Sequence, residues 1–218
     1  MRAVFLGRAE CGHSDRAEQF LRSRFDDVLV VNASGPGTTL CPSLLGANPD
    51  ALFAFRSHII VRPAFLSAID FCINFHPGPP ERRGSGCVNV ALAAGDRTYG
   101  VTCHHMDNAI DNGPIIDVRR FPIGDQDGVA DVLARTYDNM LCQFYDVAHL
   151  VASKTRLPSS GEQWRGPVGT ARAMNAMRQI SLAPDAAADL QRQFRATVCG
   201  PYGPFLMLHG TRFVPEKE

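Results

Sequence analysis

The sequence has no excess of either charge and no long apolar run. Its 22 basic and 22 acidic side chains balance over 218 residues, so the overall charge favours neither nucleic acid nor an anionic membrane as a partner. No run of about 18 apolar residues occurs, which argues against a transmembrane helix. The apolar run after Met1 is also too short for the core of a signal peptide. We therefore expect a cytoplasmic protein without nucleic-acid or membrane partners.

The sequence also lacks the cysteine patterns of disulfide frameworks and zinc sites. Its seven cysteines are odd in number and contain no Cys-x-x-Cys pair. His104 and His105 lie near Asp107 and Asp111, but adjacent residues on a strand point to opposite faces and cannot easily share one ion. We expect no metal, and we expect most of the cysteines to be small buried side chains.

Neither common phosphate-binding motif is present near the N-terminus. The segment Gly7–Ser14 has glycines at P-loop spacing, but His13 stands where that motif needs its lysine. The Gly-x-Gly-x-x-Gly pattern is absent as well. An ordinary turn between a strand and a helix is favoured here, with a nucleotide-binding turn as the alternative.

What the sequence does contain is an alternation of short apolar runs with segments of helical character. This pattern predicts an α/β fold with a Rossmann-like, mostly parallel twisted sheet and helices on both faces. Asp15 and Glu18 resemble a capping box that would start the first helix. The predicted strands are Arg2–Leu6, Val28–Val31, Leu52–Phe55, Phe71–Phe75, Thr98–Met106 and Ile115–Ile123, and the predicted helices are Asp15–Phe25, Pro63–Ile69 and Val129–Val151.

The last quarter of the chain predicts a short extension rather than a second domain. We expect a catalytic domain over residues 1–156, and a C-terminal helix-loop-hairpin extension over residues 157–218 packed on that domain. Leu157–Gly169 is rich in glycine and proline and holds Trp164, which either stacks on a base or caps the core. The segment Phe205–Val214 predicts a hairpin that turns at His209-Gly210. Its free edge could pair with a second subunit, so a homodimer is one hypothesis.

The segment Asn74-Phe75-His76-Pro77-Gly78-Pro79-Pro80 carries the clearest sign of chemistry. Asn74 and His76 are two residues apart, so on a strand both side chains point to the same face. They end a predicted parallel strand, which is where open α/β sheets bind ligands. A structural role for a satisfied asparagine and histidine is the alternative. Asp111, in an Asp-x-Gly turn, supplies a carboxylate downstream.

At these residues the chain resembles the formyltransferases that use N10-formyltetrahydrofolate. The resemblance rests on Asn-x-His-Pro with its proline-rich loop, and on the block from Tyr99 to Ile116 that contains Ile110-Asp111-Asn112-Gly113. The sequence of the proline-rich loop, together with Phe194–Thr197 and Gly203-Pro204-Phe205, is most similar to the corresponding sequences of the small sugar N-formyltransferases. Arg82 departs from those relatives, which often have an aromatic residue at that place.

The resemblance implies a formyltransferase fold and a set of roles. It implies that Asn74, His76 and Asp111 are catalytic, and that the acceptor is the amine of a nucleotide-linked aminodeoxysugar used in surface polysaccharides. N10-formyltetrahydrofolate would be the cosubstrate, and the reaction would need no metal. The folate site would comprise Ser57, His58, Ile59, Ile60, Asp107, Asn108 and Ile110, and the acceptor site Pro79, Pro80, Arg82 and Gly84.

Three rival functions remain at this point. The acceptor could be another small amine, such as a phosphoribosylglycinamide. The same three side chains could activate water, which would make the protein a formyltetrahydrofolate hydrolase; such hydrolases usually carry an N-terminal domain for which we expect no room here. An inactive folate-binding protein is disfavoured because all three side chains are present.

Overall fold

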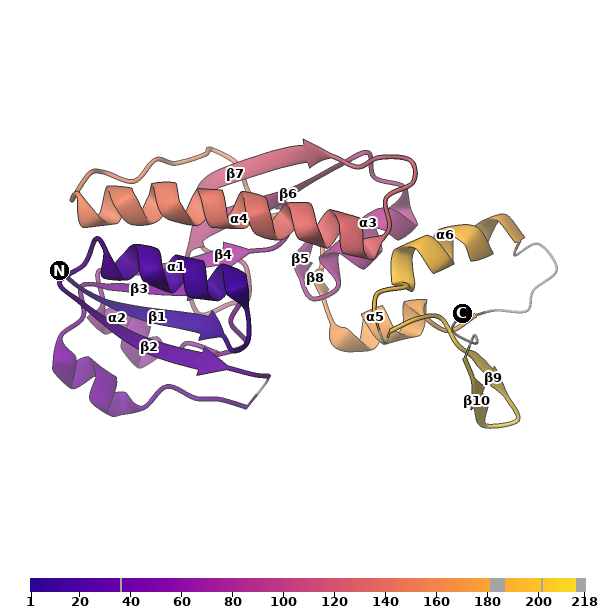
Figure 1. The fold of residues 1–218 in the computed structure, drawn as a ribbon, viewed down its shortest axis with the longest axis horizontal. Coiled ribbons are helices and arrows are strands. Elements are labelled where there is room, and N and C mark those ends of the chain that lie inside the picture. The colour runs from indigo at the N-terminus through magenta and orange to yellow at the C-terminus, as the bar shows by residue number, and fades with distance from the viewer. Residues whose placement is uncertain (36, 181–186, 201, 215–218) are drawn as a thin grey trace.

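A six-stranded sheet forms the centre of the molecule (Figure 1). The structure is a computed structural model that describes residues 1–35, 37–180, 187–200 and 202–214. The strand order is β2-β1-β3-β4-β6-β7. The strands are β1 (Arg2–Arg8), β2 (Asp27–Ala33), β3 (Ala51–Phe55), β4 (Phe71–His76), β6 (Thr98–His105) and β7 (Ile115–Pro122).

The directions of these strands confirm the prediction of a mostly parallel sheet. The pairs β1–β2, β1–β3 and β3–β4 are parallel, and the pairs β4–β6 and β6–β7 are antiparallel. Strand β6 alone is therefore reversed, and β7 runs in the same direction as the first four strands. Each of the six predicted strand segments overlaps one strand of the sheet.

Helices cover both faces of the sheet, and each face has its own apolar cluster. Helices α1 (Gly12–Arg22) and α4 (Val129–Ala152) pack on one face, where the ring of Phe144 lies among those of Phe5, Phe53 and Phe75. On the other face, α2 (Pro63–Ala68) and the 3-10 helix η1 (Pro42–Ala47) contribute to a second apolar cluster. Every residue of β3 is buried because the strand is covered from both sides.

The start of α1 differs from the prediction. The helix begins at Gly12 after Cys11, which makes no side-chain capping bond, and it ends at Arg22. Asp15 lies in the first turn, and Glu18 pairs with Arg22 at 2.9 Å instead of capping the helix. The capping-box interpretation was therefore wrong, because Asp15 already lies inside the helix and the Glu18 side chain is engaged by Arg22.

The C-terminal part projects from one end of the sheet (Figure 1). A strap formed by residues 153–170 leads from α4 to this part, and its short β8 (Val168–Gly169) pairs with β5 (Arg83–Gly84). Helices α5 (Ala171–Met177) and α6 (Ala187–Thr197) follow. Helix α6 contacts α3 (Cys87–Ala94), and the buried side chain of Ala196 joins the cluster that Leu92 and Val132 share.

The predicted hairpin is confirmed. Strands β9 (Leu206–Leu208) and β10 (Thr211–Phe213) are antiparallel and turn at His209-Gly210. Residues 181–186, 201 and 215–218 of the predicted extension lie outside the described part of the chain.

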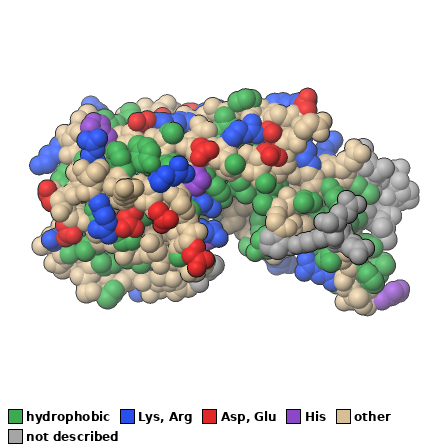
Figure 2. All heavy atoms as spheres, in the orientation of Figure 1, with side chains coloured by type: hydrophobic (Ala, Val, Ile, Leu, Met, Phe, Trp, Pro, Cys, Tyr) green, Lys and Arg blue, Asp and Glu red, His purple; other side chains and the backbone are tan. Residues whose placement is uncertain are grey.

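Charged side chains of both signs mix over the visible face (Figure 2). No helix among the described residues has the length and apolar character needed to cross a membrane.

Four of the seven cysteines are buried, as predicted for most of them. Cys11, Cys72, Cys87 and Cys103 lie in the interior, and all seven cysteines are free. Burial raises the pKa of Cys72 and of Cys87 to about 12, so both thiols stay protonated and behave as apolar side chains.

Candidate active site

Asn74 and His76 lie at the carboxyl end of β4, in the middle of the sheet. In the register of the sheet Asn74 stands between Ala54 of β3 and His104 of β6. The side chain of His76 is 3% exposed, whereas that of Asn74 is only partly buried. The two side chains thus share one face, as the two-residue spacing predicts, and Asn74 is the more exposed of the two.

Asp111 meets both of them. Its Oδ2 lies 3.2 Å from Nδ1 of His76, and its Oδ1 lies 3.4 Å from Nδ2 of Asn74. The backbone of Asp111 has a φ of 43°, a left-handed conformation that Asp and Asn tolerate better than most residues. The backbone N–H of Gly84 donates to Oδ2 at 2.8 Å, and Arg83 donates to the carbonyl oxygen of Asp111 at 2.7 Å. The structure therefore gathers the predicted carboxylate, amide and imidazole at one point.

A second histidine, His104, belongs to the same cluster and was not predicted to do so. Its Nδ1 lies 2.8 Å from the carbonyl oxygen of His105, which places the ring proton on Nδ1. The lone pair of Nε2 then accepts from Nδ2 of Asn74 at 3.0 Å, in preference to the 3.5 Å contact with Asp111. His104 fixes the orientation of the Asn74 amide. Only the pairing of β4 with β6 reveals this contact, and the sequence does not show that pairing.

The proline-rich loop wraps closely around His76. A Cβ added to Gly78 would lie 2.7 Å from Nε2 of His76 and 2.7 Å from the Arg82 carbonyl oxygen, so only glycine fits there. Thr102 donates to the carbonyl oxygen of Gly78 at 2.7 Å. Pro79 and Pro80 are buried. The loop is thus a rigid support for the imidazole, and the two prolines offer little surface to an acceptor.

Burial and hydrogen bonding work against each other at His76. Burial lowers the pKa of His76, while the Asp111 carboxylate and the Arg82 carbonyl oxygen, 2.7 Å from Nε2, both favour the protonated ring. The net pKa is below the ordinary value, so the expectation that Asp111 would raise it holds only for that one interaction. For Asp111, burial favours the neutral form, but the His76 imidazole and the Gly84 N–H outweigh it and lower the pKa.

The two arginines after the proline-rich loop have different surroundings. The guanidinium of Arg82 makes a bidentate ion pair with Asp96, in which Nε donates to Oδ2 at 3.0 Å and Nη2 donates to Oδ1 at 2.9 Å. It is therefore directed toward Asp96 rather than toward Asn74 and His76. Arg83 instead braces the Asp111 turn by donating to the carbonyl oxygens of Ile110 and Asp111.

The segments predicted to hold folate flank one apolar cluster. Ile59 is buried in the cluster on the α2 face, and Met106 packs against the same cluster. Ile60 and Ile110 are 72% and 58% exposed, so both present apolar surface to solvent. The remaining predicted folate residues are Ser57 and His58 in the first segment, and Asp107 and Asn108 in the second. Asp107 accepts from the backbone N–H of Ala109 at 2.9 Å, which shapes the second segment.

Two arginines and a histidine lie together farther along the same edge of the sheet, where β1 and β3 end. Nη1 of Arg8 lies 3.2 Å from Nε2 of His58, and Arg56 stacks 3.5 Å from the ring centre of Tyr137. Neither arginine has a carboxylate within 4.0 Å among the described residues. Burial and the charges of Arg8 and Arg56 lower the pKa of His58. These residues, Arg8, Arg56 and His58, are called the cationic edge below.

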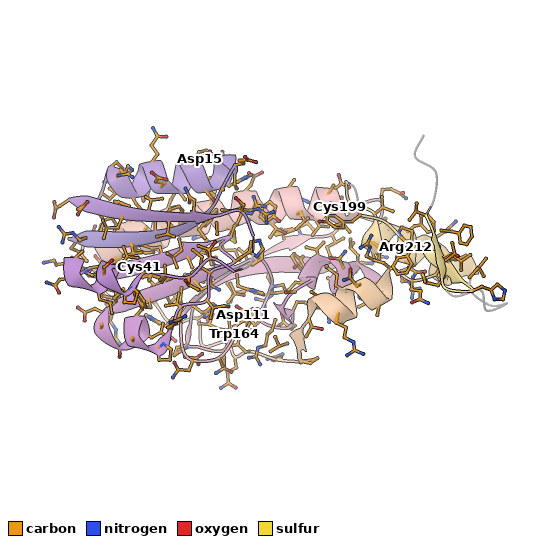
Figure 3. All side chains as sticks on the ribbon, turned by 90° about the horizontal axis from the view of Figure 1, so that it is seen from below. Asp15, Cys41, Asp111, Trp164, Cys199 and Arg212 are labelled. Atoms are coloured by element: carbon orange, nitrogen blue, oxygen red, sulfur yellow. The ribbon has the colours of Figure 1, made fainter. Side chains whose placement is uncertain are left out.

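Trp164 of the strap covers the two imidazoles. Its ring meets that of His104 edge to face at 4.9 Å and that of His76 at 5.6 Å. Trp164 and Asp111 both lie near the middle of the molecule in the view of Figure 3, and Trp164 donates its Nε1–H to the carbonyl oxygen of Gly113, two residues after Asp111. Trp164 is only partly buried, and whether it also stacks on a base stays a prediction. Among the described residues, no three His, Cys, Asp or Glu side chains are arranged to hold a metal ion.

Comparison with known proteins shows which family these residues resemble. The model of the family described as Formyl transferase matches residues 42–145, a range that contains Asn74, His76, His104 and Asp111. The methionyl-tRNA formyltransferase of Ehrlichia chaffeensis is 33% identical over 99 residues, which are 44% of this chain and 32% of that protein. The chain thus spans about a third of the length of that relative and of its Ehrlichia canis counterpart.

Solved structures extend the likeness to the whole fold. A sugar N-formyltransferase from Shewanella sp. superposes with a TM-score of 0.79 at 17% identity, over 100% of this chain and 97% of that one. An N-formyltransferase from Helicobacter canadensis, in complex with folinic acid and dTDP-3-aminofucose, gives 0.69 at 17% identity, over 89% and 79% of the two chains. These likenesses confirm the predicted formyltransferase fold. The chain thus matches the formyl transferase family over residues 42–145, and it shares the fold of solved formyltransferases.

Proposed function

We propose that the protein transfers a formyl group from N10-formyltetrahydrofolate to the amine of a nucleotide-linked aminosugar. The observation that carries this proposal is the meeting of Asn74, His76 and Asp111 within hydrogen-bonding distance at the carboxyl edge of the sheet. An amide donor, an imidazole and a carboxylate are the groups that attack of an amine on a formyl carbon requires.

Asn74 would stabilise the tetrahedral adduct. When the amine attacks, the formyl oxygen gains negative charge, and a positioned N–H donor lowers the energy of that state. One N–H of Asn74 donates to Nε2 of His104 at 3.0 Å, while the contact of Nδ2 with Asp111 is long, at 3.4 Å. The second N–H is therefore only weakly engaged and is available to the formyl oxygen once the formyl donor is bound.

His76 and Asp111 would manage the proton that the attacking amine loses. Because both ring nitrogens of His76 face acceptors, protonation of the ring completes a second hydrogen bond. The carboxylate of Asp111 stabilises the resulting imidazolium, and burial makes the ring give the proton up again. That proton goes to N10 of the folate as the bond between N10 and the formyl carbon breaks.

Two observations support a nucleotide-linked acceptor. Solved structures with this fold include sugar N-formyltransferases, and the Helicobacter canadensis protein is in complex with folinic acid and dTDP-3-aminofucose. The cationic edge offers two arginines without carboxylate partners among the described residues, and its place at the end of β3 is next to the end of β4 that carries His76. Arginines in this state suit a diphosphate. The folate would then lie along Ser57–Ile60 and the loop of Asp107, Asn108 and Ile110.

The proposal is tested by following tetrahydrofolate release from N10-formyltetrahydrofolate. We expect release with one member of a panel of amino-sugar nucleotides, and none without an amine. Release with phosphoribosylglycinamide or with methionyl-tRNA instead would keep the transferase and reject the sugar. Formate release without any amine would show a hydrolase. No release of tetrahydrofolate with any acceptor would contradict the proposed activity.

A further inference from the structure

We propose that Trp164 is a positioning residue of the transfer site, whose ring holds the imidazoles of His76 and His104 in place and shields them from water. This inference rests on the proposed function only in that it assigns those imidazoles to the transfer reaction. Trp164 lies outside residues 42–145, the range that the family model matches. The strap therefore adds a part to the site from beyond that range.

The ring is placed to restrain both imidazoles at once. It meets His104 at an interplanar angle of 88° and His76 at 75°, which are edge-to-face contacts with aromatic partners. His104 in turn orients the amide of Asn74 through the 3.0 Å contact. A single side chain thus touches the proton-handling imidazole, and also the imidazole that sets the direction of the amide donor.

The ring is itself fixed on several sides. Its Nε1–H donates to the carbonyl oxygen of Gly113 at 2.8 Å, which ties it to the turn that carries Asp111. The next residue, Arg165, donates its backbone N–H to the carbonyl oxygen of Pro80 at 2.9 Å. The guanidinium of Arg83 lies 5.9 Å from the ring centre. The strap is therefore bound both to the proline-rich loop and to the Asp111 turn.

A more distant ion-pair network holds the strap to the sheet. Arg120 of β7 makes two contacts of 2.7 Å with Glu162 and one of 3.2 Å with Glu81. Ser160 donates its backbone N–H to the carbonyl oxygen of Ile115 at 3.2 Å. These bonds place the strap without touching either imidazole, so the effect of the ring can be separated from that of the strap.

Loss of the ring should change the titration of His76. The groups that face His76 are the carboxylate of Asp111, the carbonyl oxygen of Arg82, the imidazole of His104, the guanidinium of Arg83 and the thiol of Cys87. Trp164→Ala leaves all five in the chain and admits water. Because burial is what lowers the pKa of His76, the pKa should then rise toward its ordinary value.

The test combines one readout that needs no reaction with one that does. Titration of the His76 imidazole by NMR, without folate or acceptor, should show a higher pKa in Trp164→Ala than in the wild type. In the transfer assay kcat should fall roughly tenfold to a hundredfold, as expected for losing two aromatic contacts, with little change in KM. An unchanged titration with unchanged kcat would overturn the inference.

Two further variants keep the test sharp. Trp164→Phe retains an aromatic ring and loses the bond to Gly113, so it should keep the wild-type titration and lose at most about tenfold in kcat. Arg165→Ala retains its backbone N–H and should match the wild type in both assays. If it reproduced the effect of Trp164→Ala, the strap and not the ring would be responsible. A wild type that transfers no formyl group would instead reject the proposed function, while the NMR titration would still decide the role of Trp164.

Discussion

The carboxyl edge of the sheet and the C-terminal hairpin use their side chains in opposite ways. In β4 Cys72, Ile73 and Phe75 are buried, and the polar residues, Asn74 and His76, make specific contacts with other polar side chains. In β10 all three residues are exposed, and Phe213 is 50% exposed. The comparison teaches that the buried sheet supplies the fixed geometry that chemistry requires, whereas the hairpin contributes little to the core.

The largest effect that sharpens this comparison is expected at His76. His76→Ala should lower the rate of transfer about 100- to 10,000-fold, the range for removing a general acid or base. Because Gly78 and Cys87 pack around the ring, some loss of stability should accompany it, and thermal unfolding measures that part separately. A purified, folded variant that transfers at the wild-type rate would contradict the role of His76.

The next effect concerns stability. Phe144 is 0% exposed and lies among four phenylalanine rings, so Phe144→Ala should lower the free energy of unfolding by about 3–5 kcal/mol. Phe213→Ala, in the hairpin, should change it by about 0.5 kcal/mol or less. Denaturant unfolding of the two variants checks the contrast, and similar losses in both would remove the distinction between the two regions.

A smaller effect, with a defined direction in pH, is expected at Asp111. Asp111→Asn removes a charge that raises the pKa of His76, so this pKa should fall further. The acid limb of the pH–rate profile, which we place below the ordinary histidine value of about 6.5, should then move to lower pH. The rate should fall roughly tenfold to a hundredfold, the value of a hydrogen bond to a charged group. Asn tolerates the positive φ of this position, so the fold should be kept. A limb that moves to higher pH would contradict this account.

The smallest effect separates two arginines. Arg56→Ala should raise the KM of a nucleotide-linked acceptor by about tenfold, because the acceptor phosphate would lose a charged hydrogen bond to the guanidinium. Arg82→Ala should leave that KM unchanged and cost about 1 kcal/mol or less of stability, because a partly exposed ion pair with Asp96 is all that it breaks. If Arg82→Ala raised KM and Arg56→Ala did not, the acceptor phosphates would lie at the proline-rich loop.

The sequence predicted the strands and the three central polar residues for physical reasons. The alternation of apolar runs follows directly from burial on both faces, and Asn74 and His76 share a face because of their spacing. Local signals were less reliable at α1, where the helix starts at Gly12, before the Asp15 and Glu18 pattern.

Contacts between distant segments could not be predicted. The pairing of His104 with Asn74 depends on the register of β4 and β6, and the contact of Trp164 with both imidazoles depends on the path of the strap. The direction of the pKa of His76 also depended on burial, which spacing does not report. Arg82 was assigned to the acceptor, and only the structure shows Asp96 beside it.

The central claim is that Asn74, His76 and Asp111 together move a formyl group from folate to an amine. The most direct measurement is to supply N10-formyltetrahydrofolate with an isotopically labelled formyl carbon and an amino-sugar nucleotide, and to locate the label by mass spectrometry. We predict that the label appears on the amine with the wild type, and at a rate reduced about 100- to 1000-fold with Asn74→Ala. Label found only in formate, or an unchanged rate with Asn74→Ala, would contradict the claim.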